Sequence, residues 1–186
     1  MNVNPIITPL AGVVGLALAF VLLAGINRRS GGEGKVAEIA EKIHRGAMVF
    51  MRREFLLISL FSLSRGGASW LGQPLINEEA AAYAGPQAVA FFLGALASSF
   101  AGFVGMFTAT KANVRTTLAA KNEGPAQALA VAFFGGSVMG LTVAAMGLIG
   151  LGGLFWFFRN HENPETVAQI MEGFAMGASL VALFYR

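Results

Sequence analysis

The 186-residue sequence contains no cysteine and no aspartate, and only 12% of its residues are charged. The lack of cysteine excludes disulfides, thiol nucleophiles and metals bound by cysteine. So few charges cannot cover the surface of an ordinary water-soluble domain. Hydrophobic residues instead make up 55% of the chain, and its mean hydropathy is +0.64. This composition predicts an all-α, polytopic membrane protein, a bundle of helices that crosses the lipid bilayer.

The basic residues are clustered along the chain. Seven of the thirteen lie between Arg28 and Arg53, and three more lie between Lys111 and Lys121. Such clusters are typical of cytoplasmic loops beside membrane-spanning helices. The excess of basic residues is therefore explained by these loops and is no sign of nucleic-acid binding. We predict no nucleic-acid partner.

Apolar segments predict about five transmembrane helices, since a helix needs about 20 apolar residues to cross the hydrocarbon core. The first segment is followed by Arg28 and Arg29, whereas a cleaved signal peptide, the rival explanation, carries its positive charge before the apolar run. The amino terminus is therefore predicted to lie outside. The predicted spans are residues 6–26, 55–71, 86–110, 128–158 and 167–186.

The second span is short and contains Arg65. An arginine at the centre of a span costs about 2.5 to 3.5 kcal/mol on insertion scales. The favoured interpretation is that Arg65 reaches the outer headgroups beside Trp70. In the alternative, Arg65 faces a wet bundle interior and has a function.

Residues 34–54 are charged but periodic, which predicts an amphipathic helix on the cytoplasmic side. Glutamate precedes a basic residue by four positions at Glu38 and again at Glu41, an arrangement that stabilises exposed helices. His44 is interpreted as polar surface, because a single histidine makes no metal site. A nucleotide or lipid-headgroup site is the less favoured alternative. The predicted apolar face consists of Val36, Ala40, Ile43, Ala47 and Phe50.

A short polar hinge at Thr110–Thr116 joins two apolar segments rich in glycine and alanine. Small residues spaced four apart in both segments predict close helix packing. The hinge, with Gly94–Met106 before it and Val131–Leu141 after it, resembles the ion-translocating membrane pyrophosphatases. Residues Ile39–Phe55 resemble the first cytoplasmic helix of that family, and Gly173–Arg186 resembles the start of its fifth transmembrane helix.

This resemblance implies a much larger protein than the present chain. Members of the family have about sixteen transmembrane helices, act as homodimers, and couple hydrolysis of magnesium-bound pyrophosphate to the pumping of protons or sodium ions. Some also require potassium. Their active site is built from aspartates and lysines, beginning with a motif that follows the position of Arg186. Because Mg²⁺ prefers carboxylate oxygens and this chain has no aspartate, we expect no catalytic or metal-binding residue here and no activity of the chain alone.

Arg186 is the one candidate functional residue. The resemblance implies that this arginine belongs to an ion gate, paired with acidic residues on other helices. The alternative is a terminal basic residue at the inner headgroups. Phe184 and Arg186 hold their family positions and favour the gate, although Tyr185 departs from the small residue usual there. Lys111 and Arg115 match the family hinge and are interpreted as topology and loop-packing residues.

Two hypotheses follow for the chain as a whole. The first is the amino-terminal part of a pyrophosphate-driven pump, because the chain ends within a predicted helix, with no cap or polar tail. The second is a complete small membrane scaffold or subunit without enzymatic activity. In either case, we predict a multi-pass protein of the cell (inner) membrane. The predicted partners of the complete pump are pyrophosphate, the lipid bilayer and a second copy of the protein.

Overall fold

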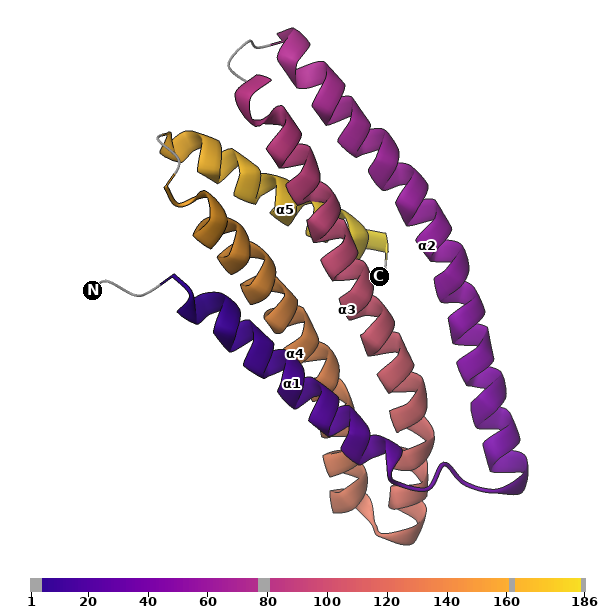
Figure 1. Cartoon of the computed structure of the whole chain (residues 1–186). Helices are drawn as coiled ribbons and strands as arrows, with labels where there is room; N and C mark the ends of the chain where they lie inside the picture. Colours follow the sequence, from indigo (N-terminus) through magenta and orange to yellow (C-terminus); the bar gives the residue numbers. More distant parts are fainter. Residues whose placement is uncertain (1–4, 77–80, 161–162, 185–186) are drawn as a thin grey trace.

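The computed structural model describes residues 5–76, 81–160 and 163–184, almost all of them in five α-helices (Figure 1). No β-strand occurs among these residues, so the all-α prediction is confirmed. The helices are α1 (Ile7–Asn27), α2 (Gly34–Ile76), α3 (Ala81–Asn122), α4 (Pro125–Phe158) and α5 (Pro164–Phe184).

Helix α3 is the centre of the bundle and contacts each of the other four helices. Helix α1 lies along α4 on one side of α3, whereas α2 runs along the other side (Figure 1). Helix α5 crosses α3 obliquely. Its extensive contact with α3 fixes its position, since α5 has much less contact with α4 and α2.

Four helices are long and apolar enough to cross a membrane, namely α1, α3, α4 and α5. These helices overlap four of the five predicted spans, whose exact limits stay a prediction. The remaining span, residues 55–71, lies within α2, which is not among the four, and it stays a prediction. The predicted amphipathic segment 34–54 and this span form one continuous helix, because no proline interrupts the chain where they meet.

The prediction that the chain turns at Thr110–Thr116 is wrong. Helix α3 continues to Asn122, and the chain reverses at Gly124. Residues 110–116 contain no glycine or proline, and their alanine, lysine and arginine favour a helix. Gly124 adopts a left-handed backbone with φ +95°, and Pro125 then fits the first turn of α4.

Glycines allow the backbones of α3 and α5 to approach closely. A Cβ on Gly94 would overlap the carbonyl oxygen of Phe174, and a Cβ on Gly177 would overlap that of Phe91. The ring of Phe174 in turn occupies the space over Gly150 of α4. The predicted close packing through small residues is thus present where α3 and α5 meet.

The predicted apolar face of α2 is only partly the face that packs. Ala40 and Ala47 are half-buried, but Val36, Ile43 and Phe50 are 43%, 48% and 55% exposed. The packed face instead uses alanines, one histidine and two methionines, and the alanines let α2 approach α3. Its half-buried or buried residues in this part of α2 are Ala37, Ala40, His44, Ala47, Met48 and Met51.

Candidate functional site

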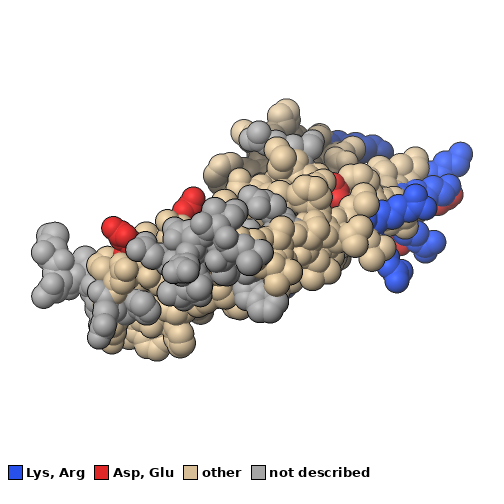
Figure 2. Space-filling model, turned by 90° about the horizontal axis from the view of Figure 1, so that it is seen from above, with Lys and Arg blue, Asp and Glu red and all other residues tan. Residues whose placement is uncertain are grey.

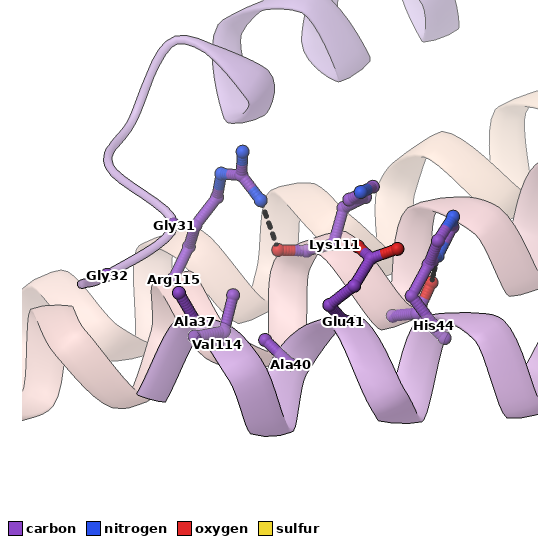
Figure 3. A pocket seen from close by; sticks show the side chains of 10 residues that line it. Gly31, Gly32, Ala37, Ala40, Glu41, His44, Lys111, Val114 and Arg115 are labelled. Carbon is purple, nitrogen blue, oxygen red and sulfur yellow. Dashed lines mark hydrogen bonds between the residues drawn. The ribbon is translucent and has the colours of Figure 1, made fainter. Parts of the chain in front are cut away.

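Lysine and arginine side chains gather at one end of the molecule, where the end of α1, the start of α2 and the end of α3 meet (Figures 1 and 2). We call this the basic end, defined by residues 28–53 and 111–121. A pocket of about 220 Å³ opens there between the α1–α2 loop, α2 and α3 (Figure 3). Its lining residues are Gly31, Gly32, Ala37, Ala40, Glu41, His44, Thr110, Lys111, Val114 and Arg115.

Arg115 ties α3 to the end of α1 and to the loop that follows it. Its guanidinium donates from Nε to the carbonyl oxygen of Arg29 at 3.0 Å, and from Nη2 to that of Asn27 at 3.4 Å. A third bond, from Nη1 to the carbonyl oxygen of Lys111, measures 2.7 Å (Figure 3). The last carbonyls of a helix lack partners within the helix and carry partial negative charge, so a cation stabilises them. These contacts agree with the loop-packing role predicted for Arg115.

An ion pair reinforces this connection. Arg29 Nη1 lies 3.5 Å from Glu123 Oε1, which joins the α1–α2 loop to the turn before α4. Both side chains are about half exposed, so the pair contributes at most about 1 kcal/mol. The bonds of Arg115 are therefore the main polar link between α1 and α3 at the basic end.

His44 joins α2 to α3. Its Nδ1 lies 2.8 Å from Thr110 Oγ1, and its ring meets Phe107 edge-on with centroids 5.3 Å apart. The Thr110 hydroxyl donates to the carbonyl oxygens of Met106 and Phe107, at 3.1 and 2.9 Å. Its single hydrogen is thus used, and His44 Nδ1–H is the donor to Oγ1, which leaves Nε2 as the unprotonated nitrogen of the neutral ring.

Burial lowers the pKa of His44, and the positive charge of Lys111 lowers it further. The imidazole is therefore neutral at pH 7. The prediction that His44 is simply polar surface was wrong, because its contact partner is 66 positions away in the sequence. The available signal was its spacing, four after Ala40 and three before Ala47, on the packed face.

The predicted acid–base pairs on α2 are both confirmed. Glu38 Oε1 accepts from Lys42 Nζ at 2.6 Å, and Glu41 Oε1 accepts from Arg45 Nε at 3.0 Å. The bond from Arg45 lowers the pKa of Glu41, which keeps this carboxylate charged in the pocket wall. On the opposite wall, Lys111 Nζ lies 5.9 Å from the Phe107 ring centroid, a cation–π contact.

This pocket is suited to packing and charge balance, not to metal catalysis. It combines one carboxylate, one neutral imidazole and two cations. Within the described part of the chain, no three His, Cys, Asp or Glu side chains come together to hold a metal ion. These residues do not fit a magnesium site.

The other residues singled out in the sequence have different outcomes. Arg186, the predicted ion gate, lies outside the described residues, as does Tyr185. The backbone of Arg65 is helical within α2, but its side chain and that of Trp70 are outside the description. Sequence reasoning also passed over Glu172, which lies within the predicted span 167–186. The signal was its charge, because it is the only acidic residue of that span.

The chain is similar to a family of membrane pumps over nearly its whole length. The family model described as inorganic H⁺ pyrophosphatase matches residues 13–186. A K⁺-insensitive pyrophosphate-energized proton pump of Moorella thermoacetica is 36% identical over 184 residues, which is 99% of this chain and 25% of that protein.

Two further relatives show the same pattern. A Clostridium tetani protein, provisionally named a K⁺-stimulated pyrophosphate-energized sodium pump, is 38% identical over 95% of this chain and 24% of its own length. A K⁺-insensitive pyrophosphate-energized proton pump of Methanosarcina mazei is 35% identical over 96% of this chain and 24% of its own length. The chain thus spans about a quarter of the length of the curated relatives it matches.

Proposed function

Because the chain belongs to the inorganic H⁺ pyrophosphatase family, we propose that it forms the amino-terminal part of a pump that couples pyrophosphate hydrolysis to transport of protons or sodium ions. One observation carries the proposal: 99% of the chain aligns with 25% of a relative named as a pyrophosphate-energized pump. The four apolar helices support a multi-pass membrane location.

In this proposal the five helices support the catalytic part of the pump. The positive-inside rule places the basic end in the cytoplasm and the amino terminus outside the cell (inner) membrane. Arg115 and His44 then hold α1, α2 and α3 together on the cytoplasmic side. We further propose Arg186 as part of the ion gate, on the family resemblance of residues 173–186, and a homodimeric assembly for the complete pump.

We place the magnesium site outside these 186 residues, since the described residues provide no cluster of ligands and the sequence contains no aspartate. Bound magnesium would neutralise charge on the pyrophosphate. Any potassium dependence would also reside elsewhere, and the names of the relatives include both K⁺-insensitive and K⁺-stimulated pumps.

Two measurements test the proposal. The gene is sequenced beyond codon 186, and the complete product is expressed and assayed in inverted membrane vesicles. We expect an open reading frame that encodes aspartate-rich helices, magnesium-dependent pyrophosphate hydrolysis, and uptake of protons or sodium ions into the vesicles. A stop codon directly after Arg186 would favour the alternative of a small membrane scaffold and overturn the proposal, as would a complete product without pyrophosphatase activity.

A further inference from the structure

A single carboxylate, Glu172, lies well inside α5. It follows Pro164, the first residue of α5, by eight positions, which places it about 12 Å along the helix. The 21 residues of α5 extend about as far as a hydrocarbon core of roughly 30 Å. Glu165, in the first turn, is at the end of the helix, where water and headgroups are within reach. Glu172 lies deeper, where headgroups are out of reach and water can reach it only through the protein.

Glu172 lies on the face of α5 that is turned away from α3. The buried face of α5 includes Gly173, Phe174 and Gly177, which make the close contacts described above. Glu172 itself is exposed. Within the described residues it has no hydrogen bond or ion pair. Its charge is therefore uncompensated by this quarter of the pump.

One side of α5 carries polar and small residues over most of its length, although the exposed side chains of Met176 and Leu183 lie on the same side. Glu165, Glu172 and Ser179 recur every seven residues, which places them along one side of the helix. Alanines occupy the positions between them at steps of three and four, and all of these residues are exposed. The complete series is Glu165, Ala168, Glu172, Ala175, Ser179 and Ala182.

This face differs in chemistry from the exposed face of α1. The exposed face of α1 is formed by large apolar side chains, among them Val13, Val14, Leu18 and Val21, each more than half exposed. Such side chains are favourable in hydrocarbon. Inserting an acidic residue near the centre of a membrane helix costs a few kcal/mol of free energy on insertion scales. The polar face of α5 is therefore unsuited to lipid.

A cavity continues the polar face of α5 beyond Glu172. It has a volume of about 520 Å³, lies between α3, α4 and α5, and is lined by Ala175, Ser179 and Ala182 of the series above. Across it, α3 contributes Ser98 and α4 contributes Gly147. Most of its lining is apolar, including Met139, Val143, Met146 and Leu151, and the hydroxyls of Ser98 and Ser179 are the polar side-chain groups in its wall.

We propose that Glu172 binds the transported cation within the membrane, on a hydrated path that continues from Glu172 to Ser179 along α5. The inference rests on the proposed pump function. For a proton, an O–H bond forms at a carboxylate oxygen as an O–H bond of the donating hydronium ion breaks, and on release the carboxyl O–H bond breaks as one forms at an accepting water. For sodium, the carboxylate oxygens coordinate the ion. In both cases the bound cation compensates the charge of Glu172.

Chemical labelling of the complete pump in vesicles tests the environment of Glu172 without requiring turnover. A hydrophobic carbodiimide reacts with carboxyl groups reached from the membrane, whereas a water-soluble carbodiimide reacts with those at the surface. We expect mass spectrometry to find the hydrophobic reagent on Glu172 and the water-soluble reagent on Glu165. The same labelling pattern at both residues would overturn the proposal.

Transport measurements on E172Q test the role of the carboxylate, with E165Q as the matched control. We expect E172Q to retain pyrophosphate hydrolysis while ions pumped per pyrophosphate fall about tenfold, because the amide cannot bind or release a proton and is a poor sodium ligand. E165Q should match the wild type in both assays. If E172Q pumps as many ions per pyrophosphate as the wild type, or loses hydrolysis and pumping equally, the inference is overturned. Activity of the wild type in the same assays would still support the pump function. Absence of hydrolysis in the wild type would instead count against the pump function itself.

Discussion

At the residue scale, the glycines of this bundle have two distinct environments. Gly94 meets the backbone of α5, and an added Cβ would overlap the carbonyl oxygen of Phe174. Gly140 of α4 has no atom within 4 Å of the position of such a Cβ. The first glycine is required by packing, whereas the second only loses helix propensity relative to alanine.

The substitution Gly94→Ala is therefore expected to destabilise the protein by about 1 to 3 kcal/mol, since backbone must move to admit the methyl group. The matched control Gly140→Ala should leave stability unchanged or raise it by up to about 1 kcal/mol. Thermal unfolding of the detergent-solubilised protein, followed by circular dichroism, measures both. Equal unfolding midpoints for the two variants would contradict the close α3–α5 contact.

His44 makes stability at the basic end depend on pH. Burial lowers the pKa of His44 in the folded protein below its ordinary value of 6.5. Between these two values the unfolded chain binds a proton that the folded protein does not, so the free energy of unfolding falls as the pH is lowered through this window. Above pH 6.5 the imidazole is largely neutral in both states, and its contribution is fully present.

The variant His44→Asn should lose this part of the pH dependence, because its amide does not titrate in this range. Thr110→Val removes the hydroxyl that accepts from Nδ1, and it should be less stable at every pH while retaining the dependence. Unfolding midpoints recorded from pH 7.5 to pH 5 distinguish the two. The same dependence in wild type and His44→Asn would show that His44 is not the responsible group.

At the scale of elements, α3 is notable for continuing past its apolar part to Asn122. This extension carries Arg115, whose bonds hold the end of α1. A helix across residues 110–122 is thus needed to position the basic end. A flexible hinge would not fix Arg115 relative to α1.

Asn113→Pro tests the extension directly. Proline inside a helix removes a hydrogen bond and clashes with the preceding turn, at a cost of about 3 kcal/mol or more, whereas a loop would tolerate it. Asn113→Ala is the control, because the side chain of Asn113 is exposed and alanine favours a helix. Hydrogen exchange of residues 106–122 should accelerate in the proline variant alone. Unchanged exchange in Asn113→Pro would favour a hinge.

The helices were largely predictable from the sequence, but their limits and contacts were not. Long apolar runs identify α1, α3, α4 and α5 by composition alone. The predicted hinge at Thr110–Thr116 is misplaced because these polar residues interrupt the apolar run without ending the helix. The residues that turn the chain are Gly124 and Pro125. The hydrophobicity of a segment indicates whether its helix lies in lipid or in water. The end of a helix is indicated by residues such as glycine and proline, which change the backbone conformation.

The site was less predictable, for physical reasons that differ between residues. The contact of His44 with Thr110 depends on which face of α2 is turned toward α3. The small residues of α2 pack there, and the larger Val36 and Ile43 are exposed. The anchoring role of Arg115 needed the position of the α1 carbonyls, which no sequence pattern reveals. Charge, by contrast, is visible in a sequence, and Glu172 could have been found by its presence in an apolar segment.

At the scale of the whole molecule, the exposed faces of the helices differ in chemistry. Helix α1 exposes mainly large apolar side chains, whereas α5 exposes carboxylates, a hydroxyl and alanines beside Met176, Leu183 and Phe184. The basic end exposes lysines and arginines (Figure 2). The first surface suits lipid, the second suits a hydrated path or other helices, and the third suits water and headgroups. Among the residues that the structure describes, none of these surfaces combines the ligands that magnesium-bound pyrophosphate needs.

The 186-residue chain should consequently fail to bind magnesium pyrophosphate. A ligand that binds the folded state at 100 times its dissociation constant stabilises it by about 2.7 kcal/mol, which raises the unfolding temperature measurably. We expect such a rise for the complete pump and none for the short chain, with magnesium alone as the control for each. Because stabilisation by a ligand requires a formed site but no turnover, this comparison locates the binding residues independently of activity. A saturable rise in the short chain would place part of the substrate site within these five helices.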